Sequence, residues 1–96
     1  MSGTPGYLVS YDVSDDRRRR KVERIISERG VRIQYSCFYC PVDRRAILNL
    51  LIRLMKIIDK TKDSIIAVSL SKDWEKLTIG TLRNPVASRR NERRVI

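Results

Sequence analysis

The sequence predicts an α+β sandwich in which two helices cover one face of a small antiparallel sheet. Three observations support this class. Aromatic and β-branched runs typical of strands alternate with two segments of helical hydrophobic spacing. Polar or turn-forming residues separate these segments, and 96 residues is the size of one ordinary domain. A hydrophobic content of 42% is typical of a folded chain and argues against wholesale disorder.

The first strand and the first helix follow each other directly. The segment YLVSYDV (7–13) is aromatic and β-branched and predicts a largely buried strand. Ser14, Asp15 and Asp16 then supply a helix cap and two first-turn carboxylates, which are favourable at the positive end of a helix. This order predicts a helix immediately after the strand.

The first helix is expected to run to about Arg29 and to be closed by Gly30 in the manner of helix C-termini. Its buried stripe consists of apolar residues at helical spacing: Val22, Ile25 and Ile26. The segment VRIQYSCFYC (31–40) is a second strand region. Since the arrangement discussed below needs four strands, we infer that this unbroken run divides into two.

Pro41 ends the strand region, and Asp43 is placed to cap a second helix. That helix is apolar over much of its circumference, so we expect it to lie deep against the sheet. Its apolar residues are Ile47, Leu48, Leu50, Leu51, Leu54, Met55, Ile57 and Ile58. After a polar turn, SIIAVSL (64–70) predicts another buried strand, and KLTIGTL (76–82) a short last one.

This order of elements predicts the ferredoxin-like βαββαβ fold with a short extra C-terminal strand. We expect residues 1–82 to form this domain. Residues 83–96 carry five arginines and few core-forming residues, so we expect a basic tail that is mobile or ordered by a partner.

The net charge is the most unusual property of the composition. Twenty-one Lys and Arg against eleven Asp and Glu give +10, whereas a small soluble domain usually has a net charge of magnitude about 2–8. The excess predicts a polyanionic partner, with nucleic acid as the default and an anionic membrane as the alternative. No apolar run reaches the roughly 18–20 residues of a membrane span, and no signal peptide is recognisable, which favours a cytoplasmic protein without membrane attachment.

The chain contains no histidine, which excludes a mechanism based on an imidazole acid and base. Any hydrolysis would need a metal ion or a carboxylate to activate water. Cys37 and Cys40 have the spacing of a redox pair, but they lie in a strand region, where residues three apart point to opposite faces. We expect packed thiols, because no His or further Cys completes a zinc site.

Asp12 ends the first strand, and its role depends on the uncovered face of the sheet. Helices on one face would leave an apolar patch on the other, which predicts a two-fold homodimer. Near such an axis the two copies of Asp12 would converge into a pair of carboxylates, an adequate site for Mg²⁺ or another divalent cation. The alternative is that Asp12 is a local turn or cap residue.

Five consecutive cations follow in the first helix. They span more than one turn, so they cannot all pair with Asp15, Asp16 and Glu23. We expect part of this block to contact phosphate without reading base sequence, the alternative being a solvated helical face. Together with a strand arginine, the expected nucleic-acid-binding residues are Arg17, Arg18, Arg19, Arg20, Lys21 and Arg32.

The segments YLVSYDVSDDRRRRKV and VRIQYSCFYC together resemble the second CRISPR-associated (Cas) protein family, the small ferredoxin-like subunit of the spacer-acquisition machinery. The resemblance covers about residues 7–70: an aspartate-ended strand, a basic helix and a QYSxF strand, in that order. It implies a homodimer that acts with the CRISPR integrase subunit when foreign DNA fragments are inserted into a CRISPR array. It also implies that some members are magnesium-dependent endonucleases acting on RNA or double-stranded DNA.

The resemblance assigns roles to six positions of this chain. Asp12 matches the metal-binding aspartate, and Tyr11 matches the aromatic residue beside it. The other positions that the family links to activity are Arg19, Lys21, Arg32 and Phe38. The last strand of such relatives often crosses to the partner's sheet, which would suit the detached segment 76–82.

Two positions depart from the family pattern. Tyr39 stands where many members carry a glutamate, so any support from that acid is lost. Lys21 stands where some carry arginine, which keeps the charge and loses bidentate geometry.

The sequence leaves two main functions open. The first is a metal-dependent endonuclease in which paired Asp12 residues hold Mg²⁺ while Arg19, Lys21 and Arg32 neutralise the phosphate. The second is a non-catalytic basic dimer that holds DNA and bridges integrase subunits. A generic RNA-binding ferredoxin-like domain ranks last, because its aromatic and glycine strand pattern is missing.

Overall fold

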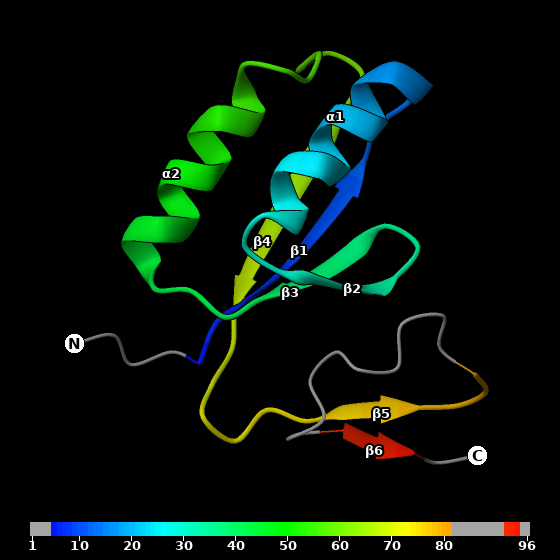
Figure 1. Ribbon diagram of the computed structural model, residues 1–96, viewed down its shortest axis with the longest axis vertical. Helices are drawn as coiled ribbons and strands as arrows, with labels where there is room; N and C mark the ends of the chain where they lie inside the picture. The colour runs from blue at the N-terminus through cyan, green and yellow to red at the C-terminus, as the bar shows by residue number, and fades with distance from the viewer. Residues whose placement is uncertain (1–4, 82–91, 95–96) are drawn as a thin grey trace.

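The structure, a computed structural model, describes residues 5–81 and 92–94. Its elements in chain order are β1 (Tyr7–Asp12), α1 (Asp16–Ser27), β2 (Val31–Gln34), β3 (Cys37–Cys40), α2 (Arg44–Met55), β4 (Ser64–Ser69), β5 (Lys76–Thr78) and β6 (Glu92–Arg94). Four strands form an antiparallel sheet in the order β2–β3–β1–β4, and α1 and α2 lie side by side on one face of it (Figure 1). This topology confirms the ferredoxin-like fold and the inferred division of segment 31–40, which turns at Tyr35 and Ser36.

The central strand β1 separates the two faces of the sheet. Tyr7, Val9 and Tyr11 are buried beneath the helices, whereas Leu8, Ser10 and Asp12 alternate with them and point the other way. Buried residues of β1 lie opposite buried residues of β3 in the sheet, as in the pair Val9 and Phe38. We call the sheet face away from the helices the open face; its side chains include Leu8, Ser10, Asp12, Tyr39, Ile66 and Val68.

The core lies between the sheet and the two helices. Helix α1 contributes Val22 and Ile26, both without exposed surface, and Ile25 packs against them half-buried. Helix α2 contributes Ile47, Leu50 and Leu54, each at most 2% exposed. Burying one such side chain stabilises the fold by about 1.5–3 kcal/mol, so these five residues are a large part of what holds the helices on the sheet.

Helix α1 does not begin as expected. Its N-cap is Asp15, whose carboxylate accepts a hydrogen bond from the backbone N–H of Arg18 at 2.9 Å. The interpretation of Ser14 as the cap is wrong, because the backbone N–H and hydroxyl of Ser14 instead donate to the side chain of Asp63. The helix ends at Ser27, and the chain reaches residue 30 through a turn.

Gly30 is not the helix-ending residue that its position in the sequence suggested. It is not one of the positive-φ glycines among the described residues, which are Gly6 and Gly80, so it is not a left-handed helix cap. A Cβ at Gly30 would lie 2.4 Å from the carbonyl oxygen of Tyr39 and 2.6 Å from Sγ of Cys40. Glycine is therefore needed because the chain passes directly against β3.

Helix α2 is capped by Asp43, as predicted: its carboxylate accepts from the N–H of Ala46 at 2.9 Å. The expectation that α2 lies deep in the protein is wrong for its outer side. Leu48, Ile52 and Met55 are 43%, 49% and 47% exposed, because α2 covers the sheet with one face only. These three residues follow one another at helical spacing and form an exposed apolar stripe.

Strand β4 is an edge strand, and the expectation of a buried strand holds only for the side beneath the helices. Ile65 and Ala67 pack against the core, whereas Ile66 and Val68 on the open face are 58% and 52% exposed. Two large apolar side chains of this strand therefore lie in solvent beside β1.

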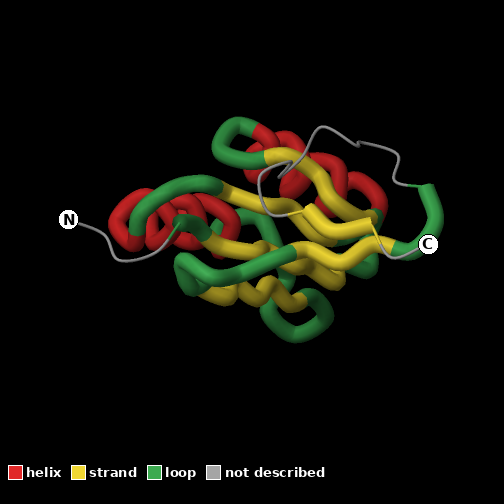
Figure 2. Tube along the Cα trace, turned by 90° about the horizontal axis from the view of Figure 1, so that it is seen from below, coloured by secondary structure: helices red, strands yellow, loops and turns green. Residues whose placement is uncertain are grey.

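Strand β5 confirms the short strand that segment 76–82 predicts, although β5 covers only Lys76–Thr78 and β6 follows it in the chain. It pairs in parallel with β6 in a second, two-stranded sheet that is set apart from the main one (Figure 1) and lies nearest the viewer in Figure 2. Most of the expected basic tail, residues 83–96, lies outside the described residues; Glu92–Arg94 form β6. The linker before β5 contacts the open face through Trp74, whose ring lies 5.1 Å from that of Tyr39.

Candidate nucleic-acid interface

Asp12 is the last residue of β1 and is exposed on the open face. Its register partner across the sheet is Ser64 of β4. Within residues 5–81 its carboxylate makes no hydrogen bond or ion pair, so the local alternative, a helix cap or turn residue, does not apply. The carboxylate is free to bind something outside the chain.

Asp12 does not belong to a metal site formed by the described part of one chain. Among the described residues no three His, Cys, Asp or Glu side chains gather closely enough to hold a metal ion. Mg²⁺ is usually bound by one or two carboxylates together with waters and substrate phosphates. The oxygen chemistry of Asp12 therefore suits Mg²⁺, but a protein-only pair of ligands requires a second chain.

Tyr11, Arg32 and Phe38 form one cluster on the other side of the sheet, beneath α1. The Tyr11 hydroxyl donates to Oε2 of Glu23 at 2.7 Å, and Nη2 of Arg32 lies 3.5 Å from Oε1 of the same carboxylate. The Arg32 guanidinium also donates to the carbonyl of Tyr35 and lies 5.0 Å from the centre of the Phe38 ring. Burial, and then the hydrogen bond to Glu23, raise the pKa of Tyr11, which keeps this hydroxyl protonated.

The six positions that the family resemblance links to activity are therefore not one constellation within a chain. The cluster beneath α1 holds three of them, and Asp12 faces away from it. Glu23 joins Tyr11 to Arg32, and sequence reasoning counted it only as a partner for the cations of the helix. No signal in the sequence pairs it with Tyr11, because the contact depends on how α1 lies over β1.

Helical geometry divides the five cations of α1 into two groups. Arg18 and Arg19 are paired: Nε of Arg18 lies 2.8 Å from Asp63, and Nη2 of Arg19 lies 2.6 Å from Asp16. The side chains of Arg17, Arg20 and Lys21 are exposed and make no hydrogen bond or salt bridge in the described part of the chain, although Arg17 is close enough to Asp15 to interact with its charge. Arg24, one turn further along, is exposed and unpartnered in the same way. We call Arg17, Arg20, Lys21 and Arg24 the cationic face of α1.

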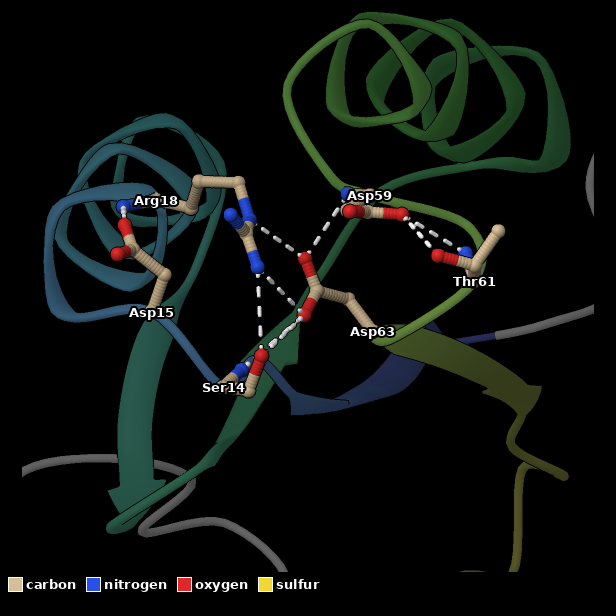
Figure 3. A network of polar contacts seen from close by, with 6 residues as sticks. All are labelled: Ser14, Asp15, Arg18, Asp59, Thr61 and Asp63. Atoms are coloured by element: carbon tan, nitrogen blue, oxygen red, sulfur yellow. Dashed lines mark hydrogen bonds and ion pairs between the residues drawn. The ribbon is translucent and has the colours of Figure 1, made fainter.

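Arg18 belongs to a polar network that ties the start of α1 to the loop before β4 (Figure 3). The Asp63 side chain has no exposed surface and accepts hydrogen bonds from Arg18, from the N–H and hydroxyl of Ser14, and from the N–H of Asp59. Arg18 and these backbone donors hold the pKa of Asp63 well below its usual range. The donors of Arg18 are used inside the protein, so Arg18 does not belong to the cationic face of α1.

The two cysteines have the character of packed thiols. Both are free; Cys40 is fully buried, and burial raises its pKa to about 11, while burial also raises the pKa of Cys37. A redox thiol has the opposite shift, because its thiolate must be stabilised.

None of the described helices combines the length and the apolar character that crossing a membrane requires.

Comparison with known proteins gives consistent matches. Residues 6–77 match the family described as "CRISPR associated protein Cas2". A "CRISPR-associated endoribonuclease Cas2 2" from Synechocystis is 40% identical over 67 residues, which cover 69% of this chain and 72% of the relative. A "CRISPR-associated endonuclease Cas2 2" from Thermus thermophilus is 33% identical over 76 residues, 79% of this chain and 84% of the relative. The crystal structure of Streptococcus pyogenes Cas2 at pH 6.5 superimposes with a TM-score of 0.65 at 36% identity, covering 71% of this chain and 88% of that one.

We predict that Asp63→Ala destabilises the protein at pH 7 and lowers its thermal midpoint by several degrees, because it leaves Arg18 and two backbone N–H groups without their acceptor. The pKa of Asp63 is lowered on folding, so its stabilisation is complete above the unfolded pKa of about 3.9 and is lost as the pH falls further. Urea unfolding should therefore show that the difference in the free energy of unfolding between wild type and variant becomes smaller as the pH falls from 7 to 2.

The matched control is Asp16→Ala, which removes a carboxylate whose ion pair with Arg19 is solvent-exposed and should change stability little. Equal unfolding curves for Asp63→Ala and the wild type at pH 7, or a gap that does not narrow in acid, would contradict the assigned role of Asp63.

Proposed function

This chain belongs to the family of CRISPR-associated proteins Cas2, and we propose that it is a nucleic-acid-binding homodimer that cleaves phosphodiester bonds with a divalent cation held between two Asp12 carboxylates. The observation that carries the proposal is the position of Asp12, whose unbonded carboxylate lies on a face that also exposes apolar side chains. The endoribonuclease and endonuclease names of the relatives support the reaction class.

The dimer is supported by the chemistry of the open face. Ile66 and Val68 are more than half exposed there, and Leu8 of the neighbouring strand is in register with Val68. A second copy of this face would remove that apolar surface from water. Because Asp12 and Ile66 lie on neighbouring strands of the same face, a two-fold axis near this end of β1 brings the two Asp12 residues together. Exposed Leu77 and Ile79 suit a β5 segment that crosses to the partner's sheet.

The cationic face of α1 provides the charge for the nucleic acid. Helix α1 begins four residues after Asp12, so Arg17 belongs to the helix turn that follows the end of β1, and Lys21 to the next turn. These side chains would hold the phosphodiester backbone, and the Asp12 carboxylates would orient the cation. When bound, Mg²⁺ supplies charge neutralisation at the phosphate and a more acidic water as nucleophile.

Four residues have a supporting role in this proposal: the ion-paired Arg19 and the clustered Tyr11, Arg32 and Phe38. The Tyr11 hydroxyl and the Arg32 guanidinium are both engaged by Glu23, on the side of the sheet away from Asp12. Tyr11 directly precedes Asp12, so its fixed position beneath α1 fixes the end of β1 that carries the carboxylate.

A second function has an observation of its own in its favour. The cationic face of α1 lies in the helix layer, whereas Asp12 lies on the open face and belongs to no group of three or more His, Cys, Asp or Glu side chains within the described residues. A basic dimer that holds DNA and bridges copies of the CRISPR integrase subunit needs only the cations. We keep this scaffold as the alternative, and both versions include a cytoplasmic location.

We predict that Asp12→Asn lowers Mg²⁺-dependent cleavage of RNA or duplex DNA by about 100-fold or more, since it removes the charge of both cation ligands. Asp16→Asn, an exposed carboxylate of α1, is the matched control and should retain activity. The measurement is single-turnover cleavage by highly purified protein. Cleavage by Asp12→Asn at the wild-type rate would show that Asp12 takes no part in the reaction.

Binding of the same substrates distinguishes the two functions. Reversing Arg17 and Lys21 together to Glu should weaken binding and reduce its dependence on salt, whichever function applies. A wild-type protein that binds in this way but cleaves nothing at any Mg²⁺ concentration would support the scaffold and contradict the nuclease.

We also predict that Ile66→Lys converts the dimer to a monomer, because it places a charge among the exposed apolar side chains of the open face. Ile52→Lys is a closely matched control: Ile52 is 49% exposed, but on the outer side of α2. Sedimentation velocity should give two-chain particles for the wild type and Ile52→Lys. Two-chain particles that persist in Ile66→Lys would exclude the open face as the interface.

A further inference from the structure

A groove of about 510 Å³ runs between α1 and the edge strand β2. Its α1 side is formed by Arg20, Arg24 and Ser27, and its β2 side by Arg32, which stands over Phe38. The groove lies on the helix-covered side of the sheet, whereas Asp12 lies on the open face. It is therefore separate from the proposed cleavage site.

The groove carries unbalanced positive charge. Arg20 and Arg24 are one helical turn apart, both exposed and without partners in the described part of the chain. Glu23 is the carboxylate among the residues that line the groove, and it is already occupied by the Tyr11 hydroxyl at 2.7 Å and by Arg32. Two guanidinium groups on one wall thus remain available for an anion. Guanidinium groups bind phosphate oxygens with strong, charge-assisted hydrogen bonds.

The opposite wall offers a fixed planar surface. The guanidinium of Arg32 lies 5.0 Å from the Phe38 ring centre and is held by the Tyr35 carbonyl and by Glu23, with its side chain 29% exposed. Nucleic-acid-binding proteins stack unpaired bases on arginine planes of this kind. The volume of the groove is in the range of small-ligand sites and is far too small for a duplex.

We propose that this groove binds one nucleotide unit of a single strand, with its phosphate at Arg20 and Arg24 and its base against Arg32. The inference rests on the nucleic-acid binding proposed above and needs neither cleavage nor Asp12. The groove gives the protein a site that distinguishes unpaired from paired strands. Glu23 and Tyr11 are positioning residues for this site, because they hold Arg32 in place.

The test is the affinity of the full chain for fluorescently labelled oligonucleotides at one fixed salt concentration. The probes are a short single-stranded DNA, an RNA of the same sequence and the DNA duplex. Arg24→Glu should weaken single-strand binding about tenfold, because charged hydrogen bonds to phosphate are lost. Arg44→Glu makes the same charge change at an exposed arginine of α2 and should weaken it less than about threefold.

A second variant tests the groove without changing the charge. Ser27→Trp places an indole in the groove from an exposed position of α1, so the fold should be retained and single-strand binding reduced, with duplex binding unchanged. Weaker binding of the single-stranded DNA, of the RNA or of both would support the site and would identify which single strand it binds.

Three results overturn the proposal: single-strand binding that Arg24→Glu and Ser27→Trp leave intact, equal losses of single-strand binding in Arg24→Glu and Arg44→Glu, or equal losses for single strand and duplex in Ser27→Trp. A wild-type chain that binds no nucleic acid would instead overturn the proposed function itself.

Discussion

The alternation of side chains along β1 is the constraint on which the rest of the molecule depends. Tyr7, Val9 and Tyr11 are buried against α1 and α2, so the intervening residues must occupy the other face. The two helices cover one face only, which leaves the apolar residues of β4 and the carboxylate of Asp12 together on the open face. Shifting β1 by one residue would exchange the two faces and bury Asp12 in the core. The burial of Tyr11 and the exposure of Asp12 therefore both follow from the register of β1.

The charge of the protein is organised by the period of α1. A run of consecutive cations cannot all face one way on a helix, so the period directs Arg18 inward and Arg17 and Lys21 outward. The inward position is stable because Asp63 is buried there with enough donors to remain ionised. The network attaches the start of α1 to the loop before β4, next to the end of β1. The same cation block therefore helps to fix the fold and leaves exposed positive charge on α1.

The elements and the topology could be predicted from the sequence because hydrophobic spacing determines both. The turn between β2 and β3 was accessible only through the expected fold, since Tyr35 is not a typical turn residue and Ser36 beside it is the one turn-forming residue there. Gly30 illustrates the limit of local rules: its place after a helix suggested a cap, yet the close approach of β3 is what requires it. The outer stripe of α2 was misjudged because composition shows how apolar a helix is and cannot show how much of it the sheet covers.

The candidate site was predictable in part. Asp12 and the cations of α1 are consecutive or nearly so in the chain, and both stand out by their charge pattern. Asp63 and Glu23 were missed because their partners are many residues distant: 45 residues separate Asp63 from Arg18, and 12 separate Glu23 from Tyr11. Such pairs are set by how elements pack, which a single sequence does not display.

The proposed nuclease requires that two chains meet through the open face with their Asp12 side chains close together. The most direct measurement is chemical cross-linking of Asp12→Cys with a short bifunctional thiol reagent, in a chain that also carries Cys37→Ser so that the buried Cys40 is the other remaining thiol. Asn49→Cys, exposed on α2, is the control. We expect rapid formation of a covalent two-chain product for Asp12→Cys and little for Asn49→Cys. Equal yields from the two variants, or single chains alone from Asp12→Cys, would contradict a dimer formed through the open face.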